Sequence, residues 1–267
     1  MRTIAHISDL HFGRLDAPVA EALAHDLRQN PPSLLVISGD FTQRARRSQY
    51  AQAAEYRKLL PEPQLVVPGN HDVPAYDVFS RVFFPLRQYR KFIAEEINPI
   101  YQDDEMLVVG VNTARGFTQK SGWIRKNQMI QMVERFSKAP PGLIKVLVTH
   151  HPFIPAPSDI KGDVIRGGRQ ILQRLEAVGV DVLLAGHLHL AYHDDVRVFH
   201  VTAKRSVLSV QAGTATSTRR RGEPNAYNWL TLSPDKVSVA VRTWTGNAFE
   251  ESRMTHFHRI NHVWTRG

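Results

Sequence analysis

The sequence predicts an α/β fold, because strand-like and helix-like segments alternate along its first third. Three times in this region, a short apolar run ends in a polar cluster and a helical pattern follows. Asp9, Asp40 and Asn70 stand in these clusters about 30 residues apart, which is the length of one strand–helix–strand unit. Each cluster is therefore expected at the carboxyl end of a parallel strand, where open α/β sheets bind their ligands.

The spacing of apolar residues and the helix-forming residues predict the elements of this first third in order. They are strands at residues 3–8, 34–38 and 64–67 and helices at 17–28 and 47–60.

The next segment, residues 76–97, is amphipathic, with basic residues between aromatic and aliphatic ones. Because it starts beside the polar cluster at Asn70, it is expected either to form a helical cap over the site, within residues 74–100, or to pack on the sheet through its apolar stripe. Its basic and aromatic face would also suit peripheral contact with a membrane.

The rest of the chain first continues the alternation of strands and helices and then consists of strand-like runs alone. Beyond residue 196, short strand-like runs separated by turns predict a second, more antiparallel sheet. No linker or internal repeat interrupts the chain, so one domain is expected over residues 1–267. The further predicted elements are strands at 106–112, 143–149, 182–185, 198–202, 207–211, 227–232 and 237–241 and helices at 126–138 and 170–178.

The composition limits the types of metal site and the cellular compartment that are expected for the chain. The chain has no cysteine, which excludes disulfides and thiolate metal sites. The N-terminal segment before Asp9 is too short for a signal peptide and no apolar run is long enough to cross a bilayer, so the cytoplasm is the expected compartment. The formal charge of +9 indicates either an anionic partner or simply a basic proteome, since only residues 219–221 concentrate the charge.

Five polar clusters along the chain together predict a metal centre. Polar groups gathered at buried strand ends cost desolvation free energy unless ions or one another satisfy them. Their nitrogen and oxygen ligands favour Mn, Fe, Zn or Co and argue against Cu(I) or iron–sulfur chemistry. The clusters are Asp9-x-His11, Gly39-Asp40, Gly69-Asn70-His71-Asp72, His150 and Gly186-His187-x-His189.

The order of these clusters resembles the pattern of the calcineurin-like metallophosphoesterase superfamily, which is D-x-H, G-D, G-N-H-[DE], H and G-H-x-H. Within that superfamily, the sequence most resembles the bacterial cyclic-nucleotide phosphodiesterase and glycerophosphodiesterase-like group. It shares that group's His-Ile-Ser-Asp-x-His opening, at residues 6–11, and its Gly-Asn-His-Asp cluster. The resemblance implies a four-layer α/β/β/α sandwich with two mixed β-sheets and a site that holds two divalent metal ions.

The resemblance also implies the metal ligands. Asp40 would bridge the two ions, because a carboxylate offers two oxygens and an imidazole cannot bridge in this way. His150 is preferred to His151 as a ligand, since the family's pattern here is His-x-Pro. The other ligands would divide into two sets, with Asp9, His11 and His189 on one ion and Asn70, His150 and His187 on the other.

In the family, the histidine that matches His71 protonates or stabilises the leaving oxygen, and a general acid of this kind suits the pKa of histidine. Neighbours in an extended segment point to opposite sides, so His71 is not expected to bind metal if Asn70 does. Protein Ser/Thr phosphatases pair this histidine with an Asp at the position of Gln43. The group that orients His71 therefore stays open, with Asp72 available.

Two arginines are weaker candidates for substrate binding. Arg44 falls where the protein phosphatases have a phosphate-binding Arg, and the alternative is a solvated loop. Arg219 opens the basic run at residues 219–221, which would either reach an anionic substrate with its guanidinium groups or remain solvated.

The predicted function is hydrolysis of a small anionic phosphodiester, such as a cyclic nucleotide or a glycerophosphodiester, by two metal ions. Lipid-linked pyrophosphate hydrolysis is an alternative, although the lipid A pathway enzyme of this superfamily has Arg where this chain has His71. Phosphomonoester hydrolysis and a non-catalytic scaffold are further alternatives, and the complete ligand set counts against the scaffold. Nucleic acid is not expected as a partner, because relatives that cleave it usually carry extra binding domains.

Overall fold

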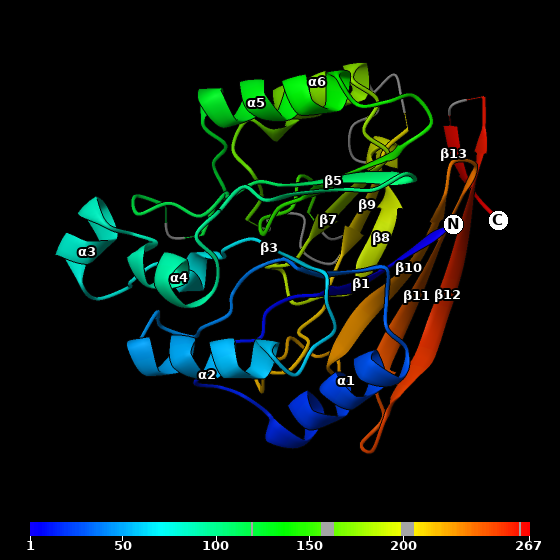
Figure 1. The fold of residues 1–267 in the computed structure, drawn as a ribbon. Coiled ribbons are helices and arrows are strands. Elements are labelled where there is room, and N and C mark those ends of the chain that lie inside the picture. The colour runs from blue at the N-terminus through cyan, green and yellow to red at the C-terminus, as the bar shows by residue number, and fades with distance from the viewer. Residues whose placement is uncertain (119, 156–162, 199–205, 262) are drawn as a thin grey trace.

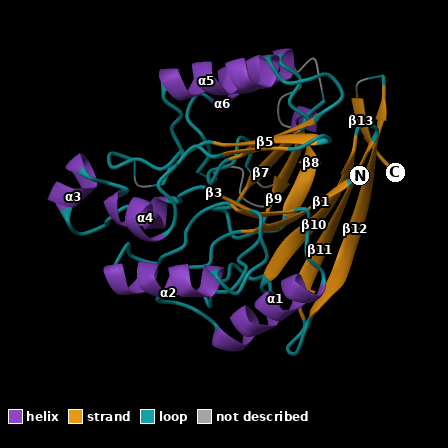
Figure 2. Cartoon of the chain, viewed as in Figure 1, coloured by secondary structure: helices purple, strands orange, loops and turns teal. Residues whose placement is uncertain are grey.

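The computed structural model describes the chain except residues 119, 156–162, 199–205 and 262. Two β-sheets lie face to face at the centre of the molecule, and helices cover the outer face of each sheet (Figure 1). Figure 2 shows the same four layers by type of secondary structure. This arrangement confirms the α/β/β/α sandwich with two mixed sheets.

The first sheet contains the three predicted N-terminal strands, which run parallel to one another. Its other four strands come from the C-terminal part of the chain and are antiparallel. In order across the sheet, the strands are β13 (Val263–Arg266), β12 (Phe249–Ile260), β11 (Lys236–Trp244), β10 (Ala226–Ser233), β1 (Arg2–Ile7), β2 (Leu34–Ile37) and β3 (Gln64–Val66).

The prediction that the C-terminal strands form a sheet of their own is therefore wrong. Strand β10 pairs directly with β1, so the predicted runs 227–232 and 237–241 extend the first sheet, whereas the run 207–211 forms a parallel strand of the other sheet. The physical reason is that β1 is largely buried and lies inside the sheet, where the polar backbone groups on both of its edges need partners. Within the predicted run 198–202, Val198 ends a short 3₁₀ helix (Val196–Val198), and residues 199–202 lie outside the described residues.

The second sheet has a parallel centre with one antiparallel strand at each edge. Apolar side chains from the facing surfaces of the two sheets, including Val36, Val146, Leu184 and Val239, form the core between them. In order across the sheet, the strands are β4 (Ile100–Gln102), β5 (Met106–Gly110), β6 (Ile144–Val148), β7 (Val182–Ala185), β9 (Leu208–Gln211) and β8 (Tyr192–Asp195).

Two pairs of helices form the outer layers, and each pair packs its apolar side onto one sheet (Figure 1). The predicted helix 47–60 ends early, at Arg57, and the chain then turns before Pro61. The helices are α1 (Ala17–Gln29) and α2 (Arg47–Arg57) on the first sheet and α5 (Lys126–Ser137) and α6 (Gly168–Ala177) on the second.

The amphipathic segment 76–97 is not one element but two short helices, α3 (Val78–Phe83) and α4 (Arg87–Phe92). Pro85 separates them, because proline has no N–H to donate and disfavours the helical conformation of the residue before it. Helix α4 buries Tyr89 in the core beneath the first sheet, so this half of the segment packs against the sheet as expected. Helix α3 lies at the outer tip of the molecule (Figure 1), so the stretch as a whole does not pack on the sheet.

Across the described ranges, no helix is long and apolar enough to cross a membrane.

Candidate active site

The five predicted clusters follow the carboxyl ends of five strands and meet at one edge of the sandwich. Asp9, Asp40 and Asn70 follow β1, β2 and β3 of the first sheet, while His150 and His187 follow β6 and β7 of the second. The backbone is strained there, since a positive φ is uncommon for a residue other than glycine. Of seven such residues in the described chain, five belong to the clusters: Asp9, His11, Asp40, His187 and His189.

Glycine precedes Asp40 and Asn70 because the turns of the site approach one another too closely for a side chain. A Cβ on Gly69 would lie 2.1 Å from Asp40 Oδ1. Gly39 has a φ of +101°, and a Cβ there would lie 2.7 Å from His150 Nδ1. The Gly-Asp and Gly-Asn pairs in the sequence are thus requirements of close backbone packing.

One group of potential ligands consists of Asp9, His11 and His189. The Nε2 atoms of His11 and His189 lie 3.5 Å and 3.6 Å from Asp9 Oδ1. His189 Nδ1 donates a hydrogen bond to Thr214 Oγ1 (2.6 Å), and burial lowers the pKa of His189 to about 4, so Nε2 keeps its lone pair. Asp9 Oδ1 and both ring nitrogens of His11 are buried without a hydrogen-bond partner among the described residues. Such orphaned groups are costly unless a cation binds them.

A second group consists of Asn70, His150 and His187. Asn70 Oδ1 lies 3.0 Å from both His150 Nε2 and His187 Nδ1. His150 Nδ1 donates to the carbonyl oxygen of Ser38 (2.7 Å), which leaves Nε2 facing the amide oxygen. Burial alone would lower the pKa of His150, but the carboxylate of Asp40 raises it to about 9. A cation between these atoms, either a proton or a metal ion, is therefore favoured.

Asp40 lies between the two groups. Its Oδ2 is 3.6 Å from His11 Nε2 in the first group, and its Oδ1 is 3.5 Å from His150 Nε2 in the second. Burial opposes ionisation of Asp40, but the neighbouring histidines, His150 first, hold its pKa well below the usual range. The side chain is thus an anion with one oxygen near each of the two groups.

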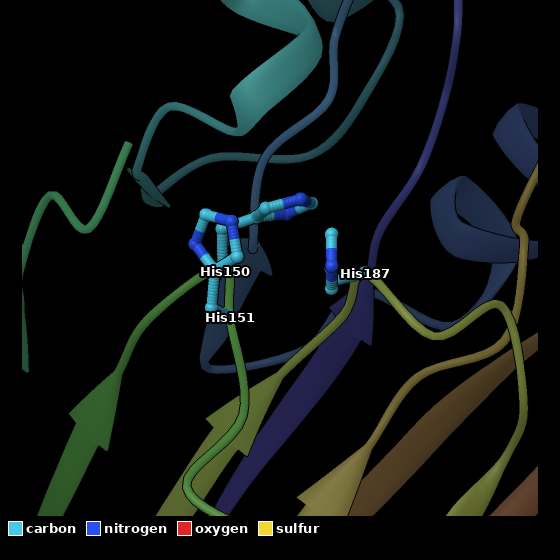
Figure 3. Close-up of side chains that lie close together, drawn as sticks. All are labelled: His150, His151 and His187. Atoms are coloured by element: carbon cyan, nitrogen blue, oxygen red, sulfur yellow. The ribbon is translucent and has the colours of Figure 1, made fainter. Parts of the chain in front are cut away.

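His151 lies beside the second group. Figure 3 shows His150 and His151 on adjacent residues after β6, with His187 approaching them from the end of β7. One ring nitrogen from each of the three lies within 4.8 Å of the others. His151 shares a hydrogen bond of 2.7 Å with Thr113 Oγ1, whereas His150 contacts both Asn70 and Asp40. His150 is therefore the better placed of the two to serve a centre built around Asp40.

The segment of His71 corrects one step of the sequence reasoning. Residues Asn70–Asp72 form one turn of 3₁₀ helix, not an extended segment, so alternation of side chains does not apply to them. Asp72 is not the orienting group either, because its carboxylate accepts hydrogen bonds from the backbone N–H groups of Phe41, Thr42 and Gly69. Burial, followed by the charge of Asp40, raises the pKa of Asp72 to about 7.

The backbone orients His71. Its Nδ1 donates to the carbonyl oxygen of Gln43 (2.9 Å), which no side-chain motif could have indicated. The ring stands edge-on to His11, with 5.0 Å between centroids, so it borders the first group. Its Nε2 accepts a hydrogen bond from Arg219 Nη1 at 2.6 Å. Burial, more than any other cause, lowers the pKa of His71.

A cavity of about 380 Å³ opens above these groups. Both arginines singled out in the sequence line it, and the guanidinium of Arg44 lies 5.4 Å from the centre of the Tyr76 ring. Sequence reasoning missed Lys120 as a lining residue, since it belongs to no motif of the site, whereas Arg221 lies in the basic run at residues 219–221. We call five of the exposed or half-buried side chains that line it the rim: Arg44, Tyr76, Lys120, Arg219 and Arg221.

Comparison with known proteins shows which family the chain resembles. Residues 2–191 match the family model of the calcineurin-like phosphoesterases. A probable cyclic nucleotide phosphodiesterase from a Synechococcus strain is 23% identical over 71% of this chain and 74% of its own. The glycerophosphodiester phosphodiesterase GpdQ of Enterobacter lignolyticus is 27% identical over 57% of each chain, so this chain matches little more than half of that relative.

Among solved structures, a purple acid phosphatase from yellow lupin (Lupinus luteus) seeds aligns with a TM-score of 0.72. The alignment covers 94% of this chain and 52% of the lupin chain at 11% identity, a likeness of fold alone.

Proposed function

The chain belongs to the calcineurin-like phosphoesterase family and is a metal-dependent phosphoric ester hydrolase, and we propose that it hydrolyses a small anionic phosphodiester with two divalent metal ions. One observation carries the proposal of two ions: Asp40 has one oxygen near each of the two groups of ligands, at 3.6 Å and 3.5 Å. A single ion would need only one of these groups.

The residues present fit such ions. Asp9 Oδ1, Asp40 Oδ2 and His11 Nε2 are buried and lack hydrogen-bond partners among the described residues, so each has a lone pair to give. Burial keeps His187 and His189 neutral by lowering their pKa values to about 3 and about 4. Oxygen and imidazole ligands suit Mn, Fe, Zn or Co. Two such ions would polarise the phosphate and supply an activated water.

The chain's own groups then act on the substrate. The hydrogen bond to the Gln43 carbonyl turns His71 Nε2 toward the cavity, where the leaving oxygen of a phosphodiester would lie. In the proposed reaction, Arg219 moves from His71 to the phosphate, which it can bind through two N–H groups. Once Arg219 has left it, His71 Nε2 takes up a proton from water in the cavity, gives that proton to the leaving oxygen as the P–O bond breaks, and becomes neutral imidazole again.

Three observations support a diester as the substrate. Both curated relatives carry names of phosphodiesterases. The cavity volume, about 380 Å³, suits a small ligand, and its rim carries four basic side chains. Two divalent ions with the charges of Asp9, Asp40 and one hydroxide would leave a net charge near +1, which matches a phosphodiester monoanion. A cyclic nucleotide or a glycerophosphodiester meets these conditions.

Activity and metal content, measured together, test the proposal. The purified protein, loaded with Mn, should hydrolyse bis-nitrophenyl phosphate, a cyclic nucleotide or glycerophosphodiesters faster than the matching monoesters. Extended chelation should abolish the activity, and Mn, Co or Zn should restore it. Metal analysis should find two equivalents per chain, and full activity in metal-free protein or a clear preference for monoesters would refute the proposal.

A further inference from the structure

Helix α3 presents its apolar side chains to solvent. Val78, Phe79 and Phe83 are 64–68% exposed, and Phe84, directly after the helix, is 51% exposed. Phe79 packs on Phe83 with 5.0 Å between ring centroids, so the exposed aromatic residues gather together. None of the residues of α3 is buried in the described structure. A contiguous apolar surface of this kind usually marks a site of interaction.

Hydrogen bonds hold α3 in this orientation. The guanidinium of Arg81 faces the protein and donates to the carbonyl oxygens of Gly116 (2.6 Å), Pro74 (2.9 Å) and Thr118 (3.2 Å). At the start of the helix, Asp77 accepts a hydrogen bond from the backbone N–H of Ser80. The polar side of the helix is thus its inner side, which is the reverse of an ordinary surface helix.

Phe117 extends this surface. It stands between Gly116 and Thr118, both of which bind Arg81, and its side chain is 67% exposed. A Cβ on Gly116 would lie 2.1 Å from the carbonyl oxygen of Arg81, so the loop and the helix are in close contact. We name this surface the α3 patch: Val78, Phe79, Val82, Phe83, Phe84 and Phe117.

Basic side chains accompany the α3 patch on two sides. Helix α4 follows after three residues and exposes Arg87, Arg90 and Lys91. On the other side lies the cavity, which Arg81 of α3 lines together with rim residues such as Lys120. Apolar side chains accompanied by positive charge are the combination that binds anionic membrane surfaces. We propose that the α3 patch docks the protein on a membrane that contains anionic lipids.

A lipid surface fits this patch better than a second copy of the chain. A twofold contact would bring the basic residues of both copies together, which like-charge repulsion opposes. Helix α3, which carries most of the α3 patch, lies at the outer tip of the molecule, away from both termini (Figure 1). A membrane bound there would lie beside the cavity, whichever phosphodiester the site hydrolyses.

Co-sedimentation with vesicles tests the proposal. Wild-type protein should bind vesicles of phosphatidylcholine mixed with phosphatidylglycerol, and bind pure phosphatidylcholine vesicles far less. High salt should weaken the binding, because screening reduces the attraction of exposed charges. The double variant Phe79→Ser/Phe83→Ser should lower the bound fraction about tenfold or more, because two large apolar side chains no longer enter the bilayer. Arg87→Glu/Lys91→Glu should remove the preference for anionic vesicles.

The matched control is Ile130→Ser/Ile260→Ser, which removes two side chains that are 53% and 58% exposed on α5 and β12. It should bind vesicles like the wild type. Hydrolysis of bis-nitrophenyl phosphate without vesicles should be unchanged in every variant, which shows that each is folded. Absence of wild-type binding to anionic vesicles, or equal binding by Phe79→Ser/Phe83→Ser, would overturn the proposal. So would a wild-type dimer that this variant abolishes, since the patch would then belong to a second copy.

Discussion

The floor and the rim of the cavity are built in different ways. We call the seven potential metal ligands the floor. Most of them are buried, and side chains such as His150 and Asp9 are hydrogen-bonded to backbone groups. The rim is mostly exposed and comes from loops after β2 and β5, from the segment before α3 and from the basic run after β9. A buried charge is costly unless a partner of opposite charge or a hydrogen bond compensates it, whereas an exposed charge contributes little to stability and can be replaced. We therefore expect the floor to determine the reaction and the rim to determine the substrate.

Asp40→Ala should have the largest effect, because it removes the carboxylate that has one oxygen near each group of ligands. Activity should fall about 10⁴-fold or more, since two ions supply several kcal/mol of stabilisation and each 1.36 kcal/mol is worth tenfold. Metal analysis should show loss at both sites, whereas Asp9→Ala should mainly weaken one. Asp235→Ala, an exposed acidic residue at a distant turn, serves as the control. Two full equivalents of metal in Asp40→Ala would contradict the bridge.

The clusters that contain the floor residues could be found in the sequence, because each depends on a short local pattern of residues. Each ligand stands at the end of an apolar run, and a glycine precedes Asp40 and Asn70 where the backbones approach. These features repeat at a spacing that the strand–helix–strand unit dictates, so the parallel strands and the gathering of the polar clusters at one edge could be predicted. The assignment of seven side chains as metal ligands came from the resemblance to the family and stays a prediction.

What the sequence did not reveal depends on contacts between distant segments. The pairing of β10 with β1 joins residues more than 200 positions apart, and no local period reports it. The orienting group of His71 is a backbone carbonyl, which any residue at position 43 would supply. Helix α3 is the more apolar of the two short helices, yet only α4 buries a side chain, because the hydrogen bonds of Arg81 hold the polar side of α3 against the protein. Composition gives the elements, and tertiary contacts decide which face is buried.

His71 lies between floor and rim, and its removal should have the next largest effect. For an alkyl phosphodiester, His71→Ala should lower turnover about 10²–10⁴-fold, the usual contribution of general acid catalysis. For bis-nitrophenyl phosphate the loss should be much smaller, because nitrophenolate leaves without a proton. Metal content should stay at the wild-type value. Equal losses across leaving groups of graded pKa would show that His71 only positions the phosphate.

Arg219 should act on substrate binding more than on the chemical step. It contacts His71 Nε2 at 2.6 Å, close to where the phosphate is proposed to bind. Arg219→Ala should raise KM about tenfold to a hundredfold, the value of one or two charge-assisted hydrogen bonds. Arg219→Lys should have a KM between those of Arg219→Ala and the wild type, since lysine lacks the planar pair of N–H donors of a guanidinium group. Arg220→Ala, which removes an exposed neighbour that pairs with Asp16, is the control. A large fall in kcat with unchanged KM would show that Arg219 acts on the chemical step, as the floor residues do.

Arg44 should show the smallest effect and so test how far the rim extends. Its side chain is exposed and its guanidinium lies over the Tyr76 ring, 5.4 Å from the centroid. An exposed charge of this kind contributes about 0.2–1 kcal/mol, so Arg44→Ala should raise KM only about two- to fivefold. The effect should shrink at high salt, because screening acts on exposed charges. Arg47→Ala, at an exposed position on α2 that does not line the cavity, should leave KM unchanged. If Arg44→Ala lowered kcat by orders of magnitude, Arg44 would touch the reacting phosphate, and the boundary between floor and rim would have to move outward to include it.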